Sequence, residues 1–135
     1  MTLGEALYSF NGRLSRFAYF TYSFVNIAFG ILGFMVAYIF ALANYPSFAA
    51  LIGITTLGSC VYSGYALLVK RLHDIGVTGN YAWGFVISSA ATTIFSTSAP
   101  VVSDFCLLVS FVGSLVVLFT PGYSGSNEYG TVPTY

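Results

Sequence analysis

The stretch from Phe17 to Val69 contains no Lys, Arg, Asp, Glu or His. A protein surface that faces water carries charged side chains, so a run of this length without any predicts that lipid surrounds it. One helix needs about 20 apolar residues to cross a bilayer. The run therefore predicts two crossings, joined by a turn at Pro46, because proline cannot continue a helix and restricts the residue before it.

The composition of the whole chain agrees with a membrane protein. Charged residues make up 6% of the 135 residues, against roughly 25% in soluble domains. The mean hydropathy is +0.84. Four basic and four acidic residues give a net charge of zero, which leaves no basic surface for nucleic acid and excludes it as a partner. Cys60 and Cys106 lie in apolar segments, so we expect free thiols rather than a disulfide.

Four hydrophobic segments divide the chain, and we expect each to form a transmembrane helix. They run over residues 17–43, 48–69, 81–97 and 101–120. The short links make neighbouring helices antiparallel. The predicted fold class is therefore an all-α integral membrane protein, an antiparallel bundle of four transmembrane helices that forms a single membrane domain.

The four cations of the chain predict its orientation. Two lie in the N-terminal arm (1–16) and two in the link 70–80, and with four crossings both regions fall on one side. The positive-inside rule makes this side cytoplasmic. Both termini, including the tail 121–135, are then predicted to be cytoplasmic in a multi-pass protein of the bacterial inner membrane.

Polar side chains within the predicted helices favour a role in packing. The segment 81–97 carries hydroxyls on one helical face: Ser89, Thr92, Thr93 and Ser96. Hydroxyls in lipid bond across helices or to carbonyls of their own helix, and Asn26, deep in the first segment, is placed to bond with this face. The alternative is a polar lining for a small solute in an oligomeric channel or transporter.

Three polar clusters, at residues 10–16, 70–80 and 121–130, fall on the predicted cytoplasmic side. Their candidate residues are Arg13, Arg16, Arg71, His73, Asp74, Asn127 and Glu128. One interpretation is structural: Asp74 pairs with Lys70 at i, i+4 and with Arg71 at i, i+3 on the surface of a helix that ends with Gly76 as a left-handed cap. The other is that the arginines and His73 converge on an anionic headgroup or phosphate. For the tail, we favour a cap folded back under the bundle, with Glu128 paired to Arg13 or Arg16.

Catalysis is the least favoured interpretation of these clusters. His73 and Asp74 are adjacent in sequence and adjacent side chains rarely point at one another, and no nucleophile is evident nearby. One His and one Asp are also too few ligands for a metal ion. We expect no catalytic residue, metal or cofactor, and a lipid-headgroup enzyme with His73 as base is only a third hypothesis.

The three clusters together resemble the YhaH/YhaI-type bacterial inner-membrane family, catalogued as domain of unknown function 805. The matching positions are Gly12, Arg13, Ser15 and Arg16, then Arg71, Leu72, His73, Asp74, Gly76 and Gly79, then Pro121, Gly122, Asn127, Tyr129 and Gly130. The chain departs from the family pattern at Phe20, Lys70, Thr78 and Asn80-Tyr81. The resemblance implies a four-helix integral protein of the inner membrane and implies no established reaction.

The function expected from the sequence is binding rather than catalysis. Every distinctive polar cluster lies on one predicted face, whereas the helices carry almost no charge. We expect a polar cytoplasmic cap that binds anionic lipid headgroups or a partner membrane protein, and a homo-oligomer is compatible with this expectation.

Overall fold

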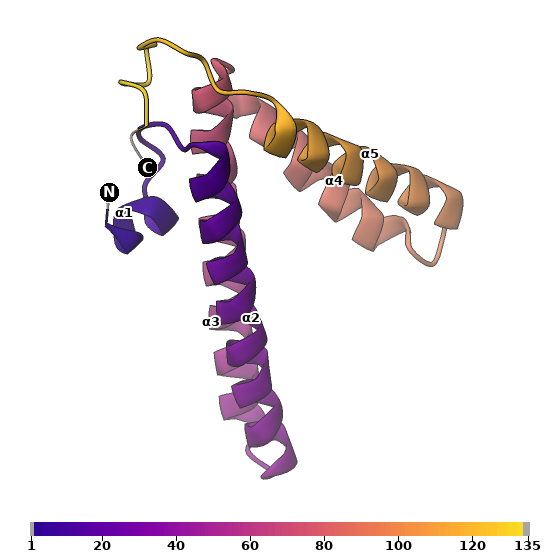
Figure 1. Cartoon of the computed structure of the whole chain (residues 1–135). Helices are drawn as coiled ribbons and strands as arrows, with labels where there is room; N and C mark the ends of the chain where they lie inside the picture. The colour runs from indigo at the N-terminus through magenta and orange to yellow at the C-terminus, as the bar shows by residue number, and fades with distance from the viewer. Residues whose placement is uncertain (1, 134–135) are drawn as a thin grey trace. The chain divides into compact units, whose positions relative to one another are not determined.

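The computed structural model describes residues 2–133, and within this range the chain is all-helical, with no β-strand. Figure 1 shows the helices α1 (Leu3–Tyr8), α2 (Arg16–Leu42), α3 (Pro46–Ile75), α4 (Ala82–Phe95) and α5 (Pro100–Phe119). A 3₁₀ turn, η1 (Gly79–Tyr81), precedes α4. The predicted all-α class is confirmed. Three helices, α2, α3 and α5, are long and apolar enough to cross a membrane, whereas α4 has 14 residues.

The turn between α2 and α3 forms as the sequence indicates. Asn44 adopts a left-handed conformation with a φ of 61°, which asparagine tolerates better than most residues. The amides of Asn44 and Tyr45 donate to the carbonyls of Ala41 and Phe40, which is the hydrogen-bond pattern of a Schellman helix end. Pro46 then opens α3, where its missing N–H costs nothing.

The end of α3 differs from the prediction. The helix continues to Ile75 rather than ending at residue 69, so the first half of the predicted loop 70–80 is helical. Gly76 has a φ of 86°, and the amides of Gly76 and Val77 donate to the carbonyls of His73 and Leu72. The predicted left-handed glycine cap at Gly76 is therefore confirmed.

The described chain forms two compact units. One contains the residues up to Phe10 together with Phe20–Leu67, and the other contains Asn11–Tyr19 together with the residues from Leu68 onward. The helices α2 and α3 each contribute residues to both units. Most large apolar side chains in both units are exposed, as expected for helices that face lipid.

Small residues bring α2 and α3 together in the first unit. A β-carbon on Gly33 would collide with the Thr56 side chain, and one on Gly30 would lie 3.2 Å from the Cys60 Sγ. Without a hydrophobic driving force between helices in lipid, such close approach supplies packing energy. In the second unit, α4 and α5 lie side by side (Figure 1). Gly113 faces the Phe85 ring, and the Ser103 hydroxyl donates to the Thr92 carbonyl at 2.9 Å.

Candidate functional site

The centre of the second unit is a carboxylate held between two arginines. Asp74, near the end of α3, accepts hydrogen bonds from Arg13 Nε and Nη2 through Oδ1, at 3.2 and 3.1 Å. Its Oδ2 accepts from Arg71 Nη1, one helical turn earlier. Arg13 and Asp74 are each 3% exposed and Arg71 is fully buried. The predicted i, i+3 pair is therefore confirmed, but it lies inside the protein rather than on a helix surface.

The guanidinium of Arg13 also gathers the carbonyls of the C-terminal tail. Its Nη1 donates to the carbonyl of Gly125 at 2.6 Å and to that of Gly130 at 3.4 Å, and its Nη2 donates to the carbonyl of Tyr123 at 2.6 Å. Together with Asp74, these acceptors engage every nitrogen of the guanidinium. Arg13 therefore fastens the tail to α3 and points inward.

Arg71 performs the same task for the end of α5. Its Nε donates to the carbonyl of Val117 at 3.0 Å, and its Nη2 donates to that of Thr120. The last carbonyls of a helix have no partner within the helix and form the negative end of its dipole. A cation from α3 thus caps α5, and a further bond from Nη1 to the Leu14 carbonyl, at 3.4 Å, adds the N-terminal arm.

Backbone bonds complete the connection of the three polar clusters. The Leu14 amide donates to the Lys70 carbonyl at 3.2 Å, and the Tyr123 amide donates to the Asp74 carbonyl at 2.7 Å. Gly122 lies so close to Asp74 that any β-carbon there would collide with Oδ2. The tail is therefore folded back onto α3, as expected for a polar cap. We call these joined clusters the cap.

His73 is part of this cap but does not face the Asp74 carboxylate. Its ring stacks on Tyr129, with centroids 3.8 Å apart and an interplanar angle of 1°. Its Nδ1 lies 3.3 Å from the Gly12 carbonyl, which only accepts, so this nitrogen carries a proton. The Asn127 side chain donates to the His73 carbonyl at 2.8 Å and accepts from the Tyr129 amide at 3.0 Å.

Glu128 accepts a hydrogen bond from its neighbour Tyr129, and its pairing with Arg13 or Arg16 stays a prediction. Arg13 has Asp74 as a carboxylate partner, and both of these residues are buried. The Tyr129 phenol donates to Glu128, and this hydrogen bond raises the pKa of Tyr129, with burial and the charge of Glu128 adding to it and a hydrogen bond with Thr78 opposing it.

Arg16 is the exposed cation of the second unit. It is the first residue of α2, and its Nη1 donates a long hydrogen bond of 3.5 Å to the carbonyl of Phe119 at the end of α5. Arg13, Lys70 and Arg71 are buried. Arg13 and Arg71 thus bond inward, to Asp74 and to carbonyls, whereas Arg16 is exposed. The predicted binding of an external anion by these residues stays a prediction.

Several polar side chains within the helices form hydrogen bonds inside the protein. The Asn26 amide donates to the Cys60 carbonyl at 3.1 Å, and its Oδ1 accepts from the Ser63 hydroxyl at 2.7 Å. The partners of Asn26 are therefore on α3, not on the hydroxyl face of residues 81–97. On that face, the hydroxyls of Thr92, Thr93 and Ser96 donate to the carbonyls of Ser88, Ser89 and Thr93 in their own helix.

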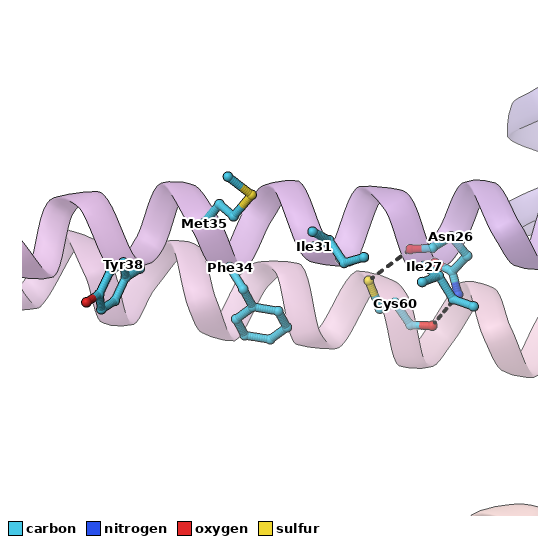
Figure 2. Close-up of a pocket in the computed structure, with 8 residues that line it drawn as sticks. Asn26, Ile27, Ile31, Phe34, Met35, Tyr38 and Cys60 are labelled. Carbon is cyan, nitrogen blue, oxygen red and sulfur yellow. Dashed lines mark hydrogen bonds between the residues drawn. The ribbon is translucent and has the colours of Figure 1, made fainter.

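Asn26 and Cys60 also line an open hollow of about 620 Å³ on the first unit (Figure 2). The other lining residues are apolar or glycine: Ile27, Gly30, Ile31, Phe34, Met35 and Tyr38. Both polar groups are turned toward each other, since Cys60 Sγ lies 3.8 Å from the Asn26 carbonyl and the Asn26 amide is bonded to Cys60. The hollow therefore presents an apolar surface. Cys60 and Cys106 are free thiols, as predicted.

Sequence reasoning missed the role of the tail carbonyls. The prediction sought a side-chain partner for each arginine, whereas most of the acceptors are carbonyls of Val117, Thr120, Tyr123, Gly125 and Gly130. The available signal was the excess of cations: the three clusters contain four cations and only two acids. Among residues 2–133, no group of three or more His, Cys, Asp or Glu side chains is placed to hold a metal ion.

These features define a class of protein: an all-helical chain with helices of membrane-spanning length. A buried arginine–aspartate network joins its N-terminal arm, the end of α3 and the C-terminal tail. The family model described as "Protein of unknown function (DUF805)" matches residues 7–131, and the chain belongs to this family. The searches of curated proteins and of solved structures found no match.

Proposed function

We propose that this protein crosses the bacterial inner membrane four times, with both termini in the cytoplasm, and binds anionic lipid headgroups at its polar cap. Arg16 carries this proposal, because it is the exposed cation of the cap whereas the other three are buried. Binding, rather than a chemical reaction, is the activity that we propose for it.

The contacts within the second unit support the proposed topology. The N-terminal arm, the end of α3 and the tail after α5 are joined by Arg13, Arg71 and the backbone bond from Leu14 to Lys70. Segments that contact one another at one end of the helices lie on one side of a membrane. All four cations belong to this end, which the positive-inside rule assigns to the cytoplasm.

The helix α4 is too short to cross the membrane alone, and we propose that the residues on either side of it complete the crossing. Its 14 residues span about 21 Å, less than the roughly 30 Å of a hydrocarbon core. The turn η1 precedes it directly, and residues 96–99 follow it before α5. Residues 81–99 carry no Lys, Arg, Asp, Glu or His, so this segment can lie within the bilayer.

The net charge of the cap and the depth of Arg16 in the membrane favour the binding of an anion at Arg16. The cap holds Arg13, Arg16, Lys70 and Arg71 against Asp74 and Glu128, which leaves a net charge of +2. The 27 residues of α2 span about 40 Å, so the end that carries Arg16 extends about 10 Å beyond the hydrocarbon, to the level of the lipid phosphates. The positive end of the α2 dipole lies at the same place and also favours a negative charge.

The geometry of His73 and Asp74 supports a role in binding rather than catalysis. The Asp74 carboxylate accepts from two arginines, and the His73 ring is bonded to the Gly12 carbonyl and stacked on Tyr129. A general base oriented by a carboxylate would require the two side chains to face each other.

Native mass spectrometry of the protein extracted with its lipids tests the proposal. The protein is reconstituted with equal amounts of phosphatidylglycerol and phosphatidylethanolamine, and the lipids retained on the protein are counted. We expect preferential retention of phosphatidylglycerol that falls several-fold in Arg16→Gln and is preserved in the matched variant Arg16→Lys. Equal retention of both lipids, or an unchanged preference in Arg16→Gln, would overturn the proposal.

A further inference from the structure

We propose that α1 is a membrane-embedded anchor, which lies at the boundary of headgroups and acyl chains in the leaflet that contains residues 59–65 of α3. Its partner is the lipid itself. The sequence assigns residues 1–16 to a cytoplasmic arm, and the helical spacing of Leu3, Leu7 and Phe10 also allows this arm to lie flat on the inner membrane surface. The contacts of this segment with α3 carry the inference further. The inference rests on α3 crossing the membrane and does not depend on anionic lipid or on Arg16.

Aromatic contacts fix the N-terminal segment against α3 in the first unit. The hydroxyls of Tyr8 and Ser59 share a hydrogen bond, and the Tyr8 ring stacks on Tyr62 with centroids 6.0 Å apart. Phe10 contacts Tyr62 and Tyr65, with centroid distances of 5.2 and 5.8 Å. Four aromatic rings therefore join this segment to one stretch of α3.

The length of α3 gives the depth of that stretch. The turn at Asn44 lies at one membrane surface, because both α2 and α3 cross from it. About 20 residues of helix cover the hydrocarbon, which places the opposite boundary near residue 66 of α3. Ser59 is about seven residues before this boundary and lies about 10 Å inside the hydrocarbon. Because the Tyr8 hydroxyl bonds to Ser59, it must itself lie within the bilayer. The helix α1, which ends at Tyr8, is therefore placed at the boundary.

The side chains of α1 are suited to the boundary between headgroups and acyl chains. Leu3 and Tyr8 are 53% and 49% exposed, so an apolar surface is left for lipid. The charged residue, Glu5, accepts from the Thr2 amide at 2.8 Å in a capping box that satisfies the first amides of the helix. Tyrosines 8, 62 and 65 form a cluster of the kind that is enriched at membrane interfaces, where a ring is apolar and its hydroxyl is polar.

Fluorescence quenching measures the depth of α1 directly. The single tryptophan is first removed by Trp83→Phe, and Leu3→Trp then places a reporter on α1 of the full-length protein. Two matched reporters mark the extremes: Asn80→Trp in the turn η1 and Leu32→Trp in the middle of α2. Each is reconstituted in phosphatidylcholine vesicles brominated at a shallow or a deep acyl position, and aqueous acrylamide is the opposing quencher.

We expect the reporter at position 3 to be quenched most by the shallow bromines and several-fold less by acrylamide than the reporter at position 80. Quenching by acrylamide as strong as at position 80, with no response to brominated lipid, would overturn the inference. Because the vesicles contain no anionic lipid, this result is independent of the proposed binding at Arg16.

A second variant tests whether the contacts with α3 hold the anchor. Adding Tyr8→Ala to the position-3 reporter removes the bond to Ser59 and the stacking on Tyr62. We expect acrylamide quenching at position 3 to rise while the reporter at position 32 is unchanged, which shows that the protein still folds in the membrane. Unchanged lipid quenching at position 3 would contradict the role of these contacts.

Discussion

Replacing Asp74 by asparagine tests the central contact of the cap. Asparagine has nearly the same volume and keeps one acceptor oxygen, but it removes the negative charge that lies between Arg13 and Arg71. Its amide would also present a donor where Oδ1 or Oδ2 now accepts from an arginine. The two guanidiniums, both buried, would then lack their shared counter-charge.

The expected cost follows from the burial of this network. Removing one partner of a buried ion pair costs about 3–5 kcal/mol, because the other charge is left uncompensated. Carbonyls of Tyr123, Gly125, Val117 and Thr120 still accept from the arginines and soften the loss. We therefore expect Asp74→Asn to lower the free energy of unfolding by about 3 kcal/mol, the lower end of that range.

Unfolding in detergent micelles by added dodecyl sulfate, followed by far-ultraviolet circular dichroism, measures this change. Asp104→Asn is the matched control, since Asp104 is exposed on α5, and it should change the free energy by less than about 0.5 kcal/mol. A cycle with Arg13→Gln should give a coupling energy of about 1 kcal/mol or more. If Asp74→Asn were no more harmful than Asp104→Asn, the buried ion network would contribute nothing and the reasoning would be wrong.

Two further substitutions probe close packing. Gly122→Ala should lower the free energy of unfolding by about 1–3 kcal/mol in the same assay, because the added methyl group collides with Asp74, whereas Gly58→Ala, with open space around it, should be neutral or stabilising. Asn26→Leu should cost about 0.6 kcal/mol, the average value of an interhelical hydrogen bond in a membrane protein, and a loss above 2 kcal/mol would show that Asn26 does more than join α2 to α3.

The helices were predictable because their signals are local. Absence of charge marked the apolar helices, Pro46 marked the start of α3, and Gly76 marked its end. The predicted transmembrane segment ended at residue 69, because Lys70 is the first charged residue after it, although the predicted cap at Gly76 gave the end of the helix correctly. A helix of 30 residues is longer than the bilayer, and its last turns carry charges that other parts of the protein bury.

The partners within the cap were less predictable, because they are distant in sequence and mostly backbone. The spacing of Arg71 and Asp74 gave their pairing correctly, since three residues on a helix bring side chains together. The pairing of Arg13 with Asp74 spans 61 residues and depends on how the arm folds. Carbonyl acceptors leave no mark in a sequence, so the bonds from Arg13 to Gly125 and Tyr123 could not be inferred.

The network explains how a protein with so few charges can bury Arg13 and Arg71. Isolated buried charges are very costly, and Asp74 compensates only one of them. The remaining compensation comes from carbonyl dipoles, above all those at the end of α5, which have no helical partner and would themselves be costly at the edge of a membrane. Arg71 satisfies Val117 and Thr120, and Arg16 reaches Phe119. Each arginine thus offsets the unsatisfied acceptors of another segment, and the same bonds hold the arm, α3 and the tail together.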